Sequence, residues 1–258
     1  GAQVISLRYQ VLRTAGGSYK GAGKYLTAVT VEPLLVEVAW GYRFSMEASV
    51  PDTSIVNVGT TENPVAAMIA QLGCPFGCGF CGGRMSPFMR RIRMRTSENI
   101  VQEMVQLYKT YGVTGFMLYD DELNVNPKIV ELMELIAKAQ RDLGVEFRLR
   151  GFIKAELFTD QQAEAMYKAG FRWILVGFES GHERILTNIQ KKAAQTDNTR
   201  CMEIAKRHNL KVKALMSVGH PGESEETVRA TRDWLLAVRP DDFDATLITT
   251  YPGTPYFD

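Results

Sequence analysis

Two periods of hydrophobic and polar positions alternate along the chain from residue 66 onward. Amphipathic stretches repeat apolar residues at helical spacing and predict helices with one buried face, as in Ile100, Val101, Met104, Val105 and Tyr108. Short apolar runs between these stretches predict buried strands. The predicted strands span residues 66–72, 116–119, 146–150, 172–176, 212–218 and 245–250.

Residues with strong positional preferences bound the predicted helices. Thr96-Ser97 begins one helix ahead of Gly112, and Asn126-Pro127 supplies a side-chain cap and a first-turn proline for the next. Thr159 and Gln162 predict a capping box, in which each side chain bonds to the backbone of the other residue. The remaining boundary signals are Gly170, Ser224 and Pro240.

Strands that alternate with helices predict a parallel sheet, because a parallel connection must return the chain to the same end of the sheet. Six β/α units of about 30 residues each match the repeat length of an α/β barrel. A complete barrel has eight units, so we expect an α/β fold with a partial (β/α)6 TIM-like barrel over residues 66–258. An open doubly wound sheet is the alternative.

Residues 1–65 depart from this pattern. They contain glycines at positions 16, 17, 21 and 23, a mixed apolar segment from Leu34 to Trp40, and a turn signal at Pro51-Asp52. We interpret them as a short N-terminal appended region or the remnant of a preceding domain.

Composition and charge argue against several classes of protein. Of the 258 residues, 45% are hydrophobic and 23% are charged, which supplies enough apolar material for a large globular core. The net charge of +1 argues against a polybasic nucleic-acid binder. No run reaches the roughly 18 apolar residues that span a bilayer, and Gly1-Ala2-Gln3 does not begin a signal peptide. We therefore expect a soluble, cytoplasmic protein.

Three of the four cysteines lie in one short segment, Cys74-Pro75-Phe76-Gly77-Cys78-Gly79-Phe80-Cys81. This grouping suits metal ligation better than disulfides between distant loops. Three thiolates can bind three irons of an iron–sulfur cubane and leave the fourth iron without a protein ligand. The two glycines let the backbone curl around such a cluster.

The alternatives for this segment are a structural zinc loop or inert core thiols. Zinc sites usually have four Cys or His ligands in paired short spacings, whereas no second cysteine pair occurs and all three histidines lie beyond residue 180. Cys201 is the remaining cysteine. On a predicted helix among Met202, Ile204 and Ala205, it is interpreted as a buried inert thiol rather than a fourth cluster ligand.

The spacing Cys74-x-x-x-Cys78-x-x-Cys81, with Phe80 before the last cysteine, resembles the signature of the radical S-adenosylmethionine (radical SAM) superfamily. Tyr119-Asp120-Asp121-Glu122 resembles the segment in which that family binds the methionine amino group, although Asp-Asp-Glu stands where the family usually has Gly-Gly-Glu. The resemblance implies cofactor contacts from Phe80, Asp120, Asp121 and Glu122.

Later segments continue the resemblance. Gly177-Phe178-Glu179-Ser180-Gly181 is similar to the family's ribose-binding segment, which implies contacts from Glu179 and Ser180. The family's glycine-rich segment near the adenine is similar to Val218-Gly219-His220-Pro221-Gly222-Glu223-Ser224, which implies cofactor contacts from Gly219 and Pro221. The likeness ends with Tyr251-Pro252-Gly253-Thr254-Pro255, which implies a cofactor contact from Tyr251. These later motifs are closest to the subgroup in which many members carry a cobalamin-binding domain.

All these segments follow the carboxyl ends of predicted strands, where α/β barrels collect their active sites. Taken singly, each has an ordinary explanation as a helix cap, a solvated acid or a turn. Arg150, at the end of the third predicted strand, is a candidate for the SAM carboxylate or for a structural ion pair.

The segment after the cysteines is basic. It is expected to bind an anionic substrate group or an electron donor such as flavodoxin or ferredoxin, with a solvated loop as the alternative. Its arginines are Arg84, Arg90, Arg91, Arg93 and Arg95.

The resemblance implies an enzyme in which Cys74, Cys78 and Cys81 hold a [4Fe-4S] cluster that reductively cleaves SAM to methionine and a 5'-deoxyadenosyl radical. We expect hydrogen abstraction from a small-molecule substrate, leading to dehydration, deoxygenation, epimerisation or rearrangement in natural-product or sugar biosynthesis. One alternative is a cobalamin-dependent methyltransferase, although no Asp-x-His-x-x-Gly ligand motif precedes the barrel and about 65 residues are too few for a doubly wound domain. The other is a non-catalytic iron–sulfur electron-transfer protein.

Overall fold

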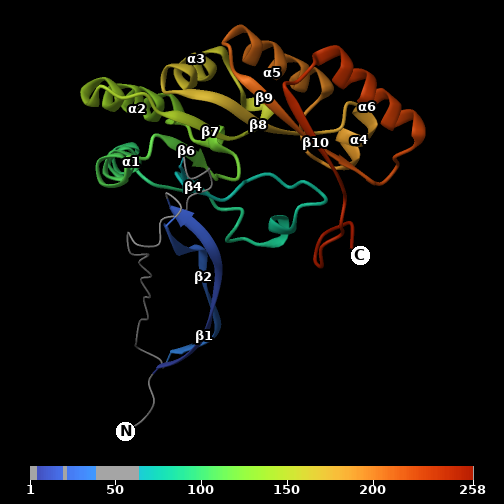
Figure 1. Ribbon diagram of the computed structural model, residues 1–258. Helices are drawn as coiled ribbons and strands as arrows, with labels where there is room; N and C mark the ends of the chain where they lie inside the picture. Colours follow the sequence, from blue (N-terminus) through green and yellow to red (C-terminus); the bar gives the residue numbers. More distant parts are fainter. Residues whose placement is uncertain (1–4, 20–21, 39–63, 258) are drawn as a thin grey trace. The chain divides into compact units, whose positions relative to one another are not determined.

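A computed structural model describes residues 5–19, 22–38 and 64–257 of the chain (Figure 1). The chain forms two compact units, residues 1–67 and residues 68–258, and each is described by itself. In the first unit, β1 (Ile5–Tyr19) and β2 (Ala22–Val38) pair as an antiparallel hairpin with Val11 opposite Val31. The sequence interpretation did not assign these strands. Trp40 and the turn predicted at Pro51-Asp52 lie outside the described residues.

The main sheet has six strands in the order β10-β9-β8-β7-β6-β3. The chain visits these positions in sequence, so the winding never reverses direction. A doubly wound sheet reverses at its centre, and this order therefore confirms the partial six-stranded barrel. The strands are β3 (Val65–Met68), β6 (Gly115–Leu118), β7 (Arg148–Ile153), β8 (Phe171–Glu179), β9 (Lys211–Val218) and β10 (Asp242–Leu247).

Helices connect consecutive strands of this sheet. Figure 1 shows α2, α3, α5 and α6 side by side along one of its faces. The helices are α1 (Ser97–Tyr111), α2 (Ile129–Leu143), α3 (Asp160–Lys168), α4 (Glu183–Asn188), α5 (Gln195–Arg207) and α6 (Glu225–Val238). Short 3-10 turns follow three strands, namely η2 (Gly82–Met85), η3 (Leu123–Val125) and η4 (Ala155–Leu157).

Helix ends largely follow the local signals. The Thr96 hydroxyl accepts from the Asn99 N–H (3.2 Å), and Gly112 ends α1 in the left-handed conformation. The capping box of Thr159 and its partner forms as predicted. The prediction for α2 was wrong in position: the helix begins at Ile129, because the Asn126 side chain accepts from the next free N–H, at Lys128 (2.8 Å), and makes a turn before the helix.

The core lies between the helices and one face of the sheet. Ile100 and Met104 of α1 and Leu132 of α2 are fully buried there, and the rings of Phe116 and Phe147 meet edge to face with centroids 5.1 Å apart. Burying side chains of this size stabilises the fold by about 1.5–3 kcal/mol each. This packing holds the helices against the sheet.

The first predicted strand is interrupted. The predicted run 66–72 is split into β3 and a two-residue strand, β4 (Gln71–Leu72), which pairs with β5 (Arg93–Met94). The break occurs because the N–H groups of Ala70 and Gln71 donate to the Asp120 carboxylate, at 3.1 and 2.5 Å, instead of extending the strand pairing. The chain thereby leaves the main sheet just before the first cysteine.

Candidate active site

The cysteine loop, residues 73–92, is closed at its base by the β4–β5 pair. The Cys74 N–H donates to the Met89 carbonyl (3.0 Å). Gly73 has φ +96°, and a Cβ there would lie 2.2 Å from the Arg91 carbonyl oxygen. Only glycine allows this close approach of the two backbone segments. The base of the loop is therefore set by backbone geometry around Gly73.

The acidic segment after β6 anchors this base. Besides the two bonds to Asp120, the Gly73 N–H donates to Asp121 Oδ2 (2.9 Å), and the Gln71 side chain donates to the Glu122 carbonyl (2.7 Å). Burial raises the pKa of Asp120 to about 6, although the N–H groups of Gln71 and Ala70 oppose the rise. Asp120 and Asp121 thus direct their carboxylates to the backbone at the start of the cysteine loop.

The three loop cysteines are free thiols that differ in exposure. Cys74 and Cys78 are half-buried and Cys81 is exposed. Burial raises the pKa of Cys74 to about 11 against the hydrogen bond from the Phe76 N–H. Burial also raises the pKa of Cys78, and the ammonium groups of Lys191 and Lys154 oppose that rise. A metal that binds these sulfurs must displace their protons.

In the described residues no three His, Cys, Asp or Glu side chains converge as they would on a single metal ion. A cubane cluster does not require such convergence, because each thiolate binds a different iron. Cys201 is fully buried in the hydrophobic core on α5, where burial raises the pKa of its thiol. Its position agrees with an inert core thiol.

A charge cluster made of Glu122, Lys154, Glu156, Glu179 and Lys191 lies beside the cysteine loop. Lys154 Nζ pairs with Glu156 (2.6 Å), donates to the Lys191 carbonyl (3.0 Å) and lies 4.2 Å from the centre of the Phe76 ring. Lys191 Nζ pairs with Glu179 Oε1 (3.3 Å). The two ammonium groups are almost completely buried, with 1% and 5% of their side chains exposed.

The charges in this cluster shift one another's ionisation. Burial raises the pKa of Glu122 to about 7, while Lys191 and Lys154 act in the opposite direction. Burial alone would lower the pKa of Lys191, but Glu179, Glu122 and Cys78 outweigh it and the pKa rises. Lys191 therefore stays charged at neutral pH beside the cysteine sulfurs.

The backbone at Glu179 has an unusual conformation, which sets the direction of its side chain. The pairing of β8 with β9 is irregular between Gly177 and Glu179, and Glu179 has φ +65°. Such a conformation in a residue with a side chain costs free energy and is concentrated at functional sites. A Cβ at Gly177 would lie 2.8 Å from Glu179 Oε1 and 3.2 Å from Lys191 Nζ. The glycine leaves room for the ion pair.

Ser180, in contrast, faces the last helix. It is buried, and its hydroxyl lies 3.1 Å from the Thr231 hydroxyl of α6 and accepts from the His182 N–H (3.1 Å). These contacts hold the chain as it leaves β8. They hold the residue that directly follows Glu179.

The glycine-rich and C-terminal segments meet the cysteine loop. Gly219 has φ +102°, and the Pro221 carbonyl accepts from the Asn188 side chain (2.7 Å). The exposed Tyr251 ring comes within 3.8 Å of the position that a Cβ would take at Gly82, next to Cys81. Phe80 packs against a buried cluster of residues from α4 and the turn after it: Ile185, Leu186 and Ile189.

Arg150 lies farther from the end of its strand than the sequence predicted. The sequence placed it at the end of its strand, but β7 continues to Ile153 and Arg150 is an exposed residue in its middle. That expectation was wrong because Gly151, Phe152 and Ile153 extend the pairing with β8. Lys154, the first residue beyond the strand, reaches the charge cluster instead.

The arginines after the cysteines have mixed surroundings. Arg90 donates to the Pro75 carbonyl (2.9 Å), and Arg95 donates to the Ile69 carbonyl (3.0 Å) and pairs with Glu103. The Arg93 guanidinium stacks on Phe88 at 3.6 Å from the ring centre. Arg91 is exposed, and the side chain of Arg84 lies outside the described part of the chain. Arg90 and Arg93 therefore contact residues of the cysteine loop, whereas these partners of Arg95 lie outside it.

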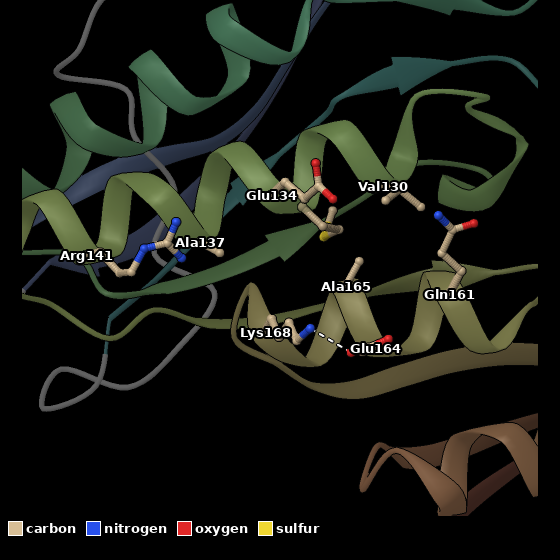
Figure 2. Close-up of a pocket in the computed structure, with 9 residues that line it drawn as sticks. Val130, Glu134, Ala137, Arg141, Gln161, Glu164, Ala165 and Lys168 are labelled. Carbon is tan, nitrogen blue, oxygen red and sulfur yellow. Dashed lines mark hydrogen bonds and ion pairs between the residues drawn. The ribbon is translucent and has the colours of Figure 1, made fainter.

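Another groove lies on the outer surface between α2 and α3. Figure 2 shows residues of both helices along it, including Glu134 and Arg141 of α2 and the ion pair of Glu164 with Lys168 (2.6 Å) of α3. Its lining contains no residue of the cysteine loop or of a strand end. This groove is therefore separate from the cysteine loop.

These features define a partial β/α barrel with a three-cysteine loop at the carboxyl ends of its strands. The chain belongs to the radical SAM superfamily, whose sequence profile matches residues 68–235. This match confirms the family expected from the cysteine spacing and the later motifs. It also confirms the class of enzyme and the two cofactors typical of that family, SAM and a [4Fe-4S] cluster.

Three known proteins illustrate the relationship. The chain is 28% identical over 191 residues to an uncharacterized methyltransferase of Pyrococcus horikoshii, covering 74% of this chain and 41% of that protein. It is 29% identical over 190 residues to the anaerobic magnesium-protoporphyrin IX monomethyl ester cyclase of Rubrivivax gelatinosus, covering 72% of this chain and 33% of the cyclase.

Among solved structures, the radical SAM methyltransferase TsrM of Kitasatospora setae, with cobalamin and a [4Fe-4S] cluster bound, superposes with a TM-score of 0.68. The two sequences are 21% identical, and the match covers 75% of this chain and 36% of TsrM. The chain thus spans between 33% and 41% of the length of these proteins. None of the helices in the described part of the chain combines the length and the apolar composition that crossing a membrane requires.

Proposed function

We propose that this chain is the SAM-cleaving barrel of a cobalamin-dependent radical SAM methyltransferase. The observation that carries the proposal is the cysteine loop, which presents three thiols at the strand ends beside the buried cations Lys154 and Lys191. The sequence alone favoured hydrogen abstraction without cobalamin. The similarity to proteins named as methyltransferases, one of them with cobalamin bound, supports the methyl-transfer alternative better.

The residues at the site fit a [4Fe-4S] cluster. Cys74, Cys78 and Cys81 would hold three irons, and the fourth would remain open to SAM. A cluster with three thiolate ligands is anionic, and the ammonium groups of Lys154 and Lys191 offset that charge where water is scarce. The Gly79 N–H, bonded to the Ile189 carbonyl (2.7 Å), ties the middle of the loop to the barrel. When bound, the cluster supplies the electron that cleaves the sulfonium of SAM.

We assign the SAM contacts to side chains that border the loop. Glu122 is half-buried and would accept from the methionine amino group, and Glu179 would accept from the ribose hydroxyls. Gly219, Pro221, Phe80 and Tyr251 would border the adenine side. Asp120, Asp121 and Ser180 would act by holding the backbone of these segments in place. Arg150 stays a candidate for the SAM carboxylate.

The test begins with the protein reconstituted anaerobically with iron and sulfide. The wild type is expected to bind a cluster and to cleave SAM when dithionite is added. Cys78→Ala is expected to lose both properties. Cys201→Ala, which removes a cysteine outside the loop, serves as the matched control and is expected to keep both. Cleavage of SAM by Cys78→Ala, or failure of the wild type to bind a cluster, would overturn the proposal.

The methyl-transfer part has its own readout. With hydroxocobalamin present, formation of S-adenosylhomocysteine that depends on cobalamin supports methyl transfer. Formation of 5'-deoxyadenosine with no cobalamin-dependent S-adenosylhomocysteine would instead support the hydrogen-abstraction reaction. A cluster that forms but neither binds nor cleaves SAM would favour the electron-transfer protein.

A further inference from the structure

A row of hydrogen bonds connects Glu179 to the C-terminal segment. The Ser217 hydroxyl donates to Glu179 Oε2 (2.6 Å) and lies 2.7 Å from His220 Nε2, while His220 Nδ1 lies 3.2 Å from the Tyr256 hydroxyl. Ser217 and His220 are buried, with 5% and 3% of their surface exposed, and Tyr256 is half-buried. The proposed function assigns a role to Glu179 and leaves the other three residues without one.

The hydrogen bonds of this row can be assigned a single donor-to-acceptor direction. An ionised carboxylate only accepts hydrogen bonds, so the one proton of Ser217 is committed to Glu179. The Ser217 oxygen must then accept from His220, which places the imidazole proton on Nε2 and leaves Nδ1 as an acceptor for the Tyr256 hydroxyl. Burial lowers the pKa of His220, in agreement with a neutral ring. Every donor in the row therefore points toward Glu179.

The C-terminal motif brings Tyr256 to this position. Thr254 is buried, and its hydroxyl and its N–H both donate to the Tyr251 carbonyl, at 2.7 and 3.1 Å. Gly253, with φ +80°, completes the turn in a conformation that suits glycine. The turn over residues 251–254 thus directs the chain back, so that Tyr256 reaches the histidine after β9.

The row also contacts the cysteine loop, through Phe80. The Phe80 ring lies 5.6 Å from the His220 ring and 6.5 Å from the Tyr256 ring, measured between centroids. The Phe80 ring thus packs against both aromatic members of the row, and hydrogen bonds strengthen where apolar groups replace water. The arrangement links the segment of the third cysteine to the orientation of Glu179.

We propose that Ser217, His220 and Tyr256 are positioning residues that orient the Glu179 carboxylate toward the ribose hydroxyls of SAM. Lys191 holds one carboxylate oxygen and Ser217 holds the other, and each oxygen keeps lone pairs for a further donor. Without the histidine and tyrosine, the Ser217 hydroxyl is free to rotate toward another acceptor. The proposal rests on the proposed role of Glu179 in binding SAM.

The experiment measures SAM affinity in the reconstituted protein and its variants. Ser217→Ala is expected to weaken SAM binding about tenfold, because a hydrogen bond to a charged group is lost, and Tyr256→Phe about twofold to threefold, because it acts at a distance. Ser217→Thr keeps the hydroxyl and is expected to bind SAM like the wild type. Tyr167→Phe, which removes a hydroxyl on an outer helix, is the matched control. In turnover, the KM for SAM should rise while kcat changes little.

A SAM analogue without one ribose hydroxyl separates positioning from a general structural role. The wild type is expected to bind this analogue more weakly than it binds SAM. If the row orients Glu179, Ser217→Ala will bind the analogue and SAM about equally, because removing the ribose hydroxyl and removing the serine hydroxyl disrupt the same interaction. Equal losses for both ligands in Ser217→Ala would contradict the proposal. So would wild-type affinity in both Ser217→Ala and Tyr256→Phe.

Two further measurements make a failure interpretable. Glu179→Gln is tested first: if it binds SAM like the wild type, the ribose-binding role of Glu179 and the row both fail. If Glu179→Gln binds weakly but the Ser217 and Tyr256 variants bind normally, only the row fails. In the protein without a cluster, nitrogen-15 NMR of the imidazole should show a neutral His220 with its proton on Nε2. A proton on Nδ1 would overturn the direction of the row.

Discussion

The base of the cysteine loop offers a sharp test of how the fold creates the site. In Gly73→Ala, the new methyl group would lie 2.2 Å from the Arg91 carbonyl oxygen, whereas ordinary contact begins at 3.4 Å, so the strands must separate by more than 1 Å. The positive φ costs about 1–2 kcal/mol for alanine. The Cys74 to Met89 hydrogen bond and the adjoining strand pair add about 1 kcal/mol for each bond lost. We expect the loop to lose about 3–4 kcal/mol in total.

Because β4 and β5 pair over only two residues each, this loss should open the loop without unfolding the barrel. The assay compares the iron content after reconstitution with the thermal unfolding midpoint. Gly73→Ala is expected to bind less than a tenth of the wild-type iron, since 1.4 kcal/mol already corresponds to about a factor of ten. Gly112→Ala is the matched control, because it has φ +69° but no atom near its Cβ. Equal iron in the two variants would refute the reasoning.

Three other predictions concern stability, measured by urea unfolding. Asp120→Asn should change the pH dependence of stability, because the folded-state pKa of Asp120, about 6, exceeds its ordinary value of 3.8. The wild type should therefore lose up to about 3 kcal/mol relative to the variant as the pH rises from below 4 through 6. A difference that stays constant with pH would contradict this. Lys191→Met should lower the free energy of unfolding by about 3–5 kcal/mol, because buried carboxylates lose their cation. Lys192→Met, at the exposed neighbouring position, should lower it little. Similar losses in the two variants would show that the ion pair is unimportant. Leu132→Ala, at a fully buried position, should lower the free energy of unfolding by about 2–5 kcal/mol. Leu236, whose side chain is 65% exposed, is the control, and Leu236→Ala should lower it by less than about 0.5 kcal/mol. A small loss in Leu132→Ala would contradict the assigned core.

Lys154 and Lys191 show why part of the site escaped prediction. Neither lysine belongs to a motif, and lysines are usually exposed. One follows β7 directly, which is a position where barrels place functional groups, while the other follows the short helix α4 with no local signal. They become neighbours of the thiols only because the strand ends converge. A lysine immediately after a buried strand was the one clue available.

The predicted strands and helices were found because their signals are local. Each apolar run or capping residue acts through neighbours within a few positions, so Thr159 could be assigned from sequence alone. Where a distant group competes for the same backbone, local signals fail. Asp120 interrupts the first strand from 50 residues away, and nothing near Ala70 predicts that.

By itself, the sequence determined the chemistry available to this protein: three thiols at a fixed spacing in one loop, a succession of β/α units, and polar motifs after the strands. Only the tertiary structure decided which of those polar residues face the loop. It turned Asp120 and Ser180 toward the backbone and a helix, and it joined Glu179 to Lys191 and Ser217. The physical reason is that spacing along the chain sets local geometry, whereas burial and charge pairing depend on strands that come together only when the sheet forms.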